Sequence, residues 1–93
     1  MSSANIQTNY IVQDEGICGG KPRIAGTRMK VQHIALEYIH AGLSIEGILE
    51  SHPHLKPAQI HAALSYYFDH QVEIERDIRE GLEFAERMEK GLT

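Results

Sequence analysis

Disulfides, long apolar runs and aromatic side chains are scarce in this sequence of 93 residues. Cys18 is the single cysteine, so no internal disulfide can form, which fits a reducing compartment. No run approaches the roughly 20 consecutive apolar residues of a membrane-spanning helix. The first residues also lack the charged-then-apolar order of a secretory signal. We therefore expect a cytoplasmic protein with no membrane association.

Catalytic and metal-binding patterns are also lacking. No carboxylate pair, nucleophile with a base, or oxyanion motif stands out, and Gly19 and Gly20 lack the spacing of a phosphate-binding loop. Six histidines are present, with His52, His54 and His61 close in sequence, but no cysteine cluster or His-Glu-x-x-His spacing accompanies them. We predict a protein that is not an enzyme and has no metal or cofactor, and keep a small metal-dependent enzyme as the weakest alternative.

The net charge of −4 argues against nucleic-acid binding, because phosphate neutralisation usually supplies that affinity. The distribution of the charges softens this objection. Residues 1–40 carry four Lys or Arg against three acids, whereas residues 71–93 carry seven acids against four bases. A basic segment therefore precedes an acidic one.

The first third of the chain has no helical periodicity. Residues 1–9 are small and polar, which predicts a flexible leader. Tyr10 to Val12 is a short β-prone run, and Ile24 lies in a second such stretch between glycines, so we expect two short strands or an extended arm. An extended arm over residues 21–30 would place several cations on one side, and these are Lys21, Arg23, Arg28 and Lys30.

Three helices are expected over residues 31–42, 44–51 and 57–67. Gly42 is a natural left-handed cap, Ser44 can cap the next helix, and Pro57 suits a first helical position. The predicted buried faces are Val31, Ile34, Ala35, Tyr38 and Ile39, then Ile45, Ile48 and Leu49, then Ile60, Ala63, Leu64, Tyr67 and Phe68.

Three such helices are the core of helix-turn-helix domains, although they are also simply a helical bundle. On the outer face of the third helix, Gln59 could pair with adenine and Ser65 with several bases, while His61 lies beside them. Lys56, at the helix entrance, could contact a phosphate. A solvated polar face with no function is an equally good interpretation.

A fourth helix is expected over residues 72–90. Pairs four residues apart, Glu75 with Arg79, Glu83 with Arg87 and Glu86 with Lys90, support it. Its apolar stripe could pack on the same chain or pair with another chain, and Gly81 permits a close helix approach. The stripe consists of Ile74, Ile78, Leu82, Ala85 and Met88.

Residues 19–67 resemble a bacterial family known as domain of unknown function 433. The resemblance rests on Gly20-Lys-Pro-Arg-Ile-Ala-Gly-Thr-Arg28, Val31, Ala41-Gly-Leu-Ser44 with Glu46, Ile48 and Leu49, Pro53-His-Leu55, and Ile60-His-Ala-Ala-Leu64-Ser-Tyr66. It implies a homeodomain-like helix-turn-helix protein with a short N-terminal β element. Members are often proposed as antitoxins beside PIN-like ribonuclease toxins.

Together these observations predict a mainly α protein with one domain over residues 1–93. Residues 31–70 would form a helix-turn-helix core, preceded by a short β element and followed by a long C-terminal helix. The first hypothesis is a homodimeric antitoxin or autoregulator that binds a PIN-like toxin and its own promoter DNA. The second is a protein-interaction module that binds no nucleic acid. The predicted DNA contacts are Lys21, Arg23, Arg28, Lys30, Lys56, Gln59, His61 and Ser65.

Overall fold

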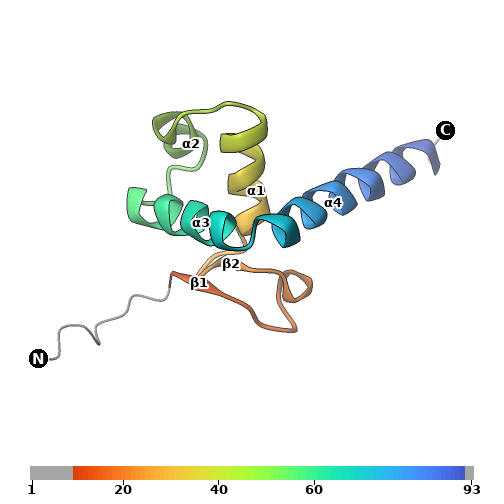
Figure 1. Ribbon diagram of the computed structural model, residues 1–93, viewed down its shortest axis with the longest axis horizontal. Coiled ribbons are helices and arrows are strands. Elements are labelled where there is room, and N and C mark those ends of the chain that lie inside the picture. The colour runs from red at the N-terminus through yellow and green to blue at the C-terminus, as the bar shows by residue number, and fades with distance from the viewer. Residues whose placement is uncertain (1–9, 92–93) are drawn as a thin grey trace, which may run out of the picture.

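The computed structural model describes residues 10–91, and the predicted leader over residues 1–9 lies outside this range. The fold is mainly α with a two-stranded sheet at its N-terminal end, as predicted (Figure 1). No helix within residues 10–91 is long and apolar enough to cross a membrane. The elements are β1 (Ile11–Val12), η2 (Cys18–Gly20), β2 (Arg23–Ile24), α1 (Val31–Ala35), η3 (Leu36–His40), α2 (Ile45–Ser51), α3 (Pro57–Asp69) and α4 (Gln71–Gly91).

The two strands pair antiparallel and lie below the helices in Figure 1, which confirms the prediction of two short strands. Ile11 pairs with Ile24, and the side chain of Ile24 is completely buried in the core. The backbone amide of Val31, the first residue of α1, donates to the carbonyl of Pro22 at 2.9 Å. The hairpin is therefore joined to the helical body through both its side chains and its backbone.

The first predicted helix changes its winding halfway along. Val31 to Ala35 form an α-helix, and Leu36 to His40 form a π-helical turn in which the amide of Ala41 donates to the carbonyl of Leu36 at 2.9 Å. A π-turn holds an extra residue, so the side chains after it rotate relative to the α-helical pattern. Tyr38 and Ile39 lie within this turn and are exposed, so their predicted place in the core is wrong. The helix ends at His40, two residues before the expected Gly42, whose φ of 76° is the left-handed conformation predicted for it.

Helices α2 and α3 begin at the residues that the sequence indicates. Ser44 accepts a hydrogen bond from the amide of Gly47 at 3.0 Å, and Pro57 occupies the first helical position of α3. Phe68 lies 56% exposed, so its predicted burial is wrong. The core contains Ile24, Val31, Ile34, Ala35, Ile48, Leu55, Ile60, Ala63, Leu64, Tyr67, Ile74 and Ile78.

Helix α4 packs on the body only over its first turns. Ile74 and Ile78 are buried, whereas every side chain from Gly81 to Gly91 is exposed. Figure 1 shows the blue end of α4 projecting away from the other helices, which gives the molecule a longest dimension of 61 Å. We call residues 81–91 the overhang.

The Ser44 cap provides a test of this local structure. Ser44→Ala removes the acceptor that satisfies a first-turn amide of α2, so we expect the free energy of unfolding to fall by about 1 kcal/mol. Ser65→Ala is the matched control, because Ser65 is exposed within α3, where alanine is a good helix former. Urea denaturation measures both. Equal stability of the two variants would contradict the capping role.

Candidate functional site

Two of the cations predicted to contact DNA instead form ion pairs with carboxylates of the same chain. Arg23 is only 7% exposed, and its Nη2 lies 3.1 Å from Oδ2 of Asp14. Lys21 places its Nζ 2.7 Å from Oδ1 of Asp77 in α4. Both residues of strand β2, Arg23 and Ile24, are buried. The interpretation of residues 21–30 as an arm with its cations on one exposed side is therefore corrected.

The remaining predicted DNA contacts divide between exposed and engaged side chains. Arg28, Lys56, His61 and Ser65 are exposed. The side-chain Oε1 of Gln59, however, accepts a hydrogen bond from the backbone amide of Lys56 at 2.7 Å. This oxygen caps α3, so the prediction that the carboxamide is available to read an adenine is corrected.

The two parts of the apolar stripe predicted along α4 lie in different environments. Ile74 and Ile78 pack in the core of their own chain, while Leu82, Ala85 and Met88 lie exposed on the overhang. The sequence left open whether this stripe meets its own core or another chain. Its N-terminal part meets its own core, and its C-terminal part is uncovered.

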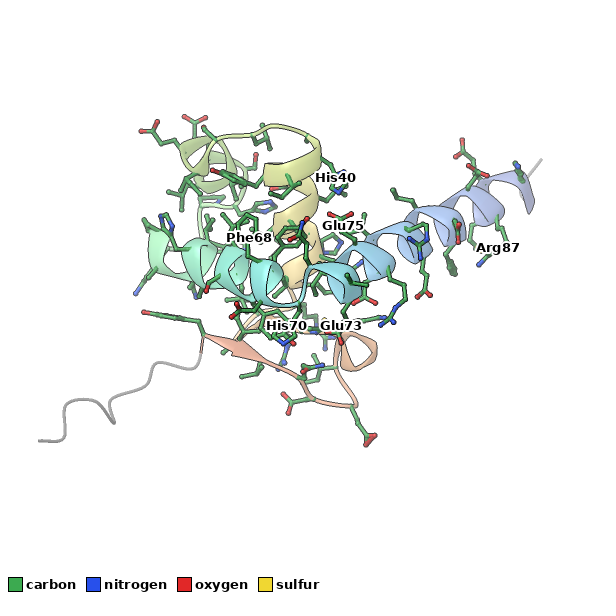
Figure 2. The ribbon with its side chains drawn as sticks, in the orientation of Figure 1. His40, Phe68, His70, Glu73, Glu75 and Arg87 are labelled. Carbon is green, nitrogen blue, oxygen red and sulfur yellow. The ribbon has the colours of Figure 1, made fainter. Side chains whose placement is uncertain are left out.

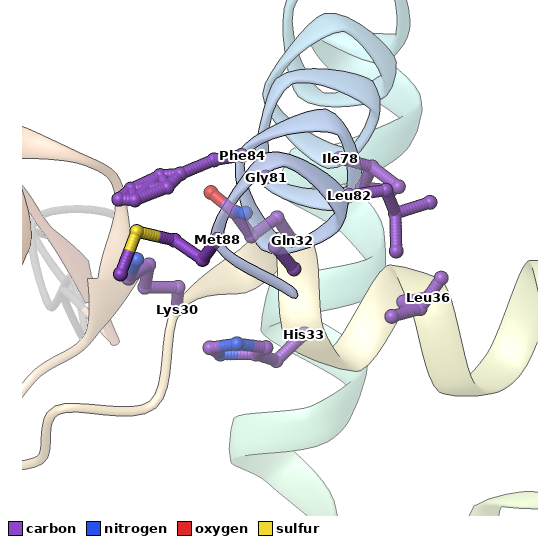
Figure 3. A pocket seen from close by; sticks show the side chains of 10 residues that line it. Lys30, Gln32, His33, Leu36, Ile78, Gly81, Leu82, Phe84 and Met88 are labelled. Carbon is purple, nitrogen blue, oxygen red and sulfur yellow. The ribbon is translucent and has the colours of Figure 1, made fainter. Parts of the chain in front are cut away.

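A groove of about 460 Å³ lies where the overhang leaves α1. Figure 3 shows Phe84 and Met88 on one side of it near Lys30, and Leu82 and Ile78 on the other side towards Leu36. At Gly81 a Cβ atom would lie 3.5 Å from Nε2 of Gln32, so a small residue suits this close approach of the helices. The lining residues are Lys30, Gln32, His33, Leu36, Ile78, Gly81, Leu82, Phe84, Ala85 and Met88.

The groove is mostly apolar, and its α1 wall carries one cation. Burial lowers the pKa of His33, and the neighbouring Lys30 lowers it further, so the imidazole is neutral at pH 7. Lys30 is thus the one charged side chain among the groove-lining residues described. A partner entering here would meet an apolar surface with a single ammonium group at one side.

Sequence reasoning missed Phe84 as a member of this site. The predicted stripe followed residues on the Leu82 side of the helix, whereas Phe84 lies on its other edge, three residues after Gly81 and four before Met88. That spacing was a usable signal. No signal in the sequence indicated that Gln32, His33 and Leu36 line the groove, because their place there depends on how α4 crosses α1.

A set of polar contacts, which we call the clamp, holds the base of α4. The hydroxyl of Tyr67 donates to Oε2 of Glu75 at 2.5 Å. Nε2 of His40 lies 2.9 Å from both carboxylate oxygens of Glu75, and Figure 2 shows these two side chains close together. Two residues further along α4, the buried carboxylate of Asp77 forms an ion pair with Lys21. The clamp therefore ties α4 to α3, η3 and the N-terminal loop.

The clamp changes the expected charge pairs of α4. Glu75 was predicted to pair with Arg79, but its carboxylate is engaged by Tyr67 and His40 instead. The hydrogen bond from Tyr67, with a smaller contribution from His40, lowers the pKa of Glu75 below its ordinary value of 4.5. Glu86 and Lys90 do form their predicted pair, at 3.4 Å.

The histidines considered as metal ligands have other neighbours. His52 places its Nε2 3.0 Å from Oε2 of Glu37, and its ring meets that of His54 edge-on. Among residues 10–91, no three His, Cys, Asp or Glu side chains lie close enough together to hold a metal ion. Cys18 points its thiol at the carbonyl of Arg28, 3.4 Å away.

Comparisons with known proteins agree on one family. Residues 11–67 match the model of a family described as protein of unknown function, DUF433. Among solved structures, the chain is similar to the crystal structure of a DUF433 member protein from Anabaena variabilis ATCC 29413, with 32% sequence identity and a TM-score of 0.71. That similarity covers 77% of this chain and 70% of the other. No curated protein matches.

The lowered pKa of Glu75 predicts a pH dependence of stability. An ionised Glu75 stabilises the fold above its ordinary pKa of 4.5, and this contribution is lost as the pH falls through the lower pKa of the folded chain. Tyr67→Phe removes the main cause of the shift, so its stability should fall less than that of the wild type between about pH 5 and pH 3.

Urea denaturation at several pH values measures this difference. Tyr66→Phe is the matched control, because the Tyr66 hydroxyl donates to the amide oxygen of Gln13 at 3.5 Å and not to Glu75. It should keep the pH dependence of the wild type. If Tyr67→Phe kept it as well, the hydrogen bond to Glu75 would not be the cause of the shift.

Proposed function

We propose that this chain, which belongs to the DUF433 family, is a protein-binding module that holds its partner in the groove between α1 and α4. One observation carries this proposal. Leu82 and Met88 are 56% exposed and Phe84 is 49% exposed, and all three line the same groove. Single exposed apolar side chains are common, but a contiguous set beside a groove is typical of an interaction surface.

The clamp supports the same proposal, because it holds the overhang in one direction before any partner arrives. Asp77 and Glu75 lie about one and two turns before Gly81, respectively, and are bound by side chains from three other parts of the fold. A surface that is already in its binding conformation loses less conformational entropy on association. The base of α4 is therefore suited to present the apolar stripe to a partner.

The role that we favour for such a module is that of an antitoxin. Helix α4 combines the exposed apolar stripe with an excess of acids, since residues 71–93 carry seven acids and four bases. The RNA-binding cleft of a nuclease is basic, so an acidic helix laid over it would be electrostatically complementary. The resemblance of the sequence to proposed partners of PIN-like ribonucleases points to the same class of toxin.

The test is complex formation with the protein encoded beside this chain. Wild-type chain should co-elute at a fixed ratio with a PIN-like nuclease from the adjacent gene and inhibit its RNA cleavage. Leu82→Glu combined with Met88→Glu should weaken the complex at least about 100-fold, because each buried side chain contributes about 1.5–3 kcal/mol.

Val72→Glu is the matched control for that pair of substitutions. Val72 is an exposed apolar residue of the same helix but lies outside the groove. It should leave both binding and inhibition unchanged. An absence of the complex, or a complex that survives Leu82→Glu with Met88→Glu, would count against the proposal.

DNA binding is a second candidate function, supported by the outer face of α3. Lys56 and His61 are exposed near the start of α3, which follows α2 after a short turn, and Ser65 is exposed about one turn beyond His61. This is the order of elements in a helix-turn-helix reader. This candidate is weaker than protein binding, because three of the predicted DNA contacts are already engaged within the chain. Lys21 and Arg23 form ion pairs with carboxylates, and the side-chain oxygen of Gln59 accepts a hydrogen bond from the backbone.

Promoter binding would depend on salt in a specific way. Each cation that meets a phosphate adds about −0.9 to the slope of log K against log salt concentration. Lys56→Gln should therefore reduce the magnitude of that slope by about 1, whereas Arg79→Gln, on α4, should not change it. Fluorescence anisotropy with the chain's own promoter measures both. If the affinity for the promoter did not depend on salt, or if Lys56→Gln did not change that dependence, the outer face of α3 would not be the DNA-binding surface.

A further inference from the structure

The charges that lie nearest to the apolar stripe of the overhang share one sign. With about 100° per residue, the apolar stripe from Phe84 to Leu82 covers roughly 160° of the helix surface. The charged residues nearest to the stripe are all acidic: Glu80 lies about 40° beyond Phe84, Glu86 about 40° beyond Leu82, and Glu89 at the Leu82 edge of the stripe itself. The bases Arg79 and Arg87 lie about 20° beyond Glu86 and Glu80, and Lys90 lies on the opposite face of the helix.

The acids beside the stripe remain available to a partner. Glu80 and Glu89 are exposed, and Glu86 forms its pair with Lys90 in open solvent, where both side chains are at least 70% exposed. Such a surface pair is worth little and is easily exchanged for another. We call Glu80, Glu86 and Glu89 the acidic rims.

The α1 wall of the groove opposes these acids with one cation only. Lys30 carries that charge, and burial together with Lys30 lowers the pKa of His33, which leaves its ring neutral. Three carboxylates against one ammonium give the site a negative balance. The rims run along α4, so a partner's cations would lie beside the overhang rather than against α1.

A second copy of this chain does not suit such a site. If two overhangs paired stripe to stripe, the acidic rims of each would border the acidic rims of the other. Charges that flank an apolar seam decide which helices pair, and like charges there disfavour the pairing. The predicted homodimer through this stripe is therefore not the arrangement that the charges favour.

We propose that the groove binds an amphipathic helix of another protein whose apolar face is bordered by lysine and arginine. This rests on the proposed function and names the chemistry of the partner. The helix would lie along the overhang, which offers about three turns of contact. Its apolar side chains would enter the groove above Gly81 and Ala85, where small residues allow a close approach, and its cations would meet the rims.

Two synthetic peptides test the role of charge. They share one set of apolar positions at helical spacing, and the residues that border this face are lysines in one peptide and glutamates in the other. Fluorescence anisotropy with the full chain at low salt should show the lysine peptide binding at least about 10-fold more tightly. That preference should shrink at high salt, because the charges are then screened.

Variants of the rims give the matched comparison. Glu80→Lys with Glu89→Lys should reverse the preference for the two peptides, whereas Glu83→Lys, on the far side of α4, should leave it unchanged. All three positions are exposed, and lysine and glutamate have similar helix propensities, so the fold is preserved. Circular dichroism confirms the helix content of each variant.

The other outcomes separate this inference from the proposed function. If both peptides bind equally and Leu82→Glu abolishes both, the groove binds helices but does not select their charge. If neither peptide binds, the groove is not a helix-binding site and the proposed function falls with it. A dimer in sedimentation that Leu82→Glu dissociates would identify a second copy as the occupant and overturn the inference.

Discussion

The buried carboxylate of Asp77 is the group on which the arrangement of this protein depends. It lies in α4 and is bound by Lys21, which precedes β2, so one ion pair joins the N-terminal loop to the last helix. A buried charge needs such a partner, because an unpaired carboxylate would be strongly destabilising in the interior. Together with Glu75, two residues earlier, it determines the direction in which α4 leaves the body of the protein. The groove and the overhang depend on these contacts, because they set the direction of α4 relative to α1.

The same contacts are the reason why we favour protein binding over DNA binding as the proposed function. The sequence suggests that Lys21 and Arg23 belong to a basic arm, but in the fold both form ion pairs with carboxylates, those of Asp77 and Asp14. What remains on the surface is an apolar stripe between acids, beside a groove with a neutral histidine. Such a surface is better suited to a basic, partly apolar protein segment than to a polyanion.

Much of the fold could be predicted because its signals are local. Ser44 and Pro57 mark helix starts through interactions within a few residues, and Gly42 marks a helix end through its own backbone angle. The misplaced residues have different causes. Tyr38 was misjudged because the π-turn shifts the helical register, and Phe68 because α3 presents a narrower face to the core than its apolar stripe suggests.

The sequence by itself determined the family, the order of the helices, and the amphipathic character of α4, since each of these depends on residue types at fixed spacing. Only the tertiary structure decided which part of that helix is covered. Ile78 and Leu82 have the same chemistry and lie one turn apart, yet Ile78 is buried and Leu82 exposed. The difference arises because the body of the protein ends between them, and that end depends on contacts between residues far apart in the chain, such as Lys21 with Asp77.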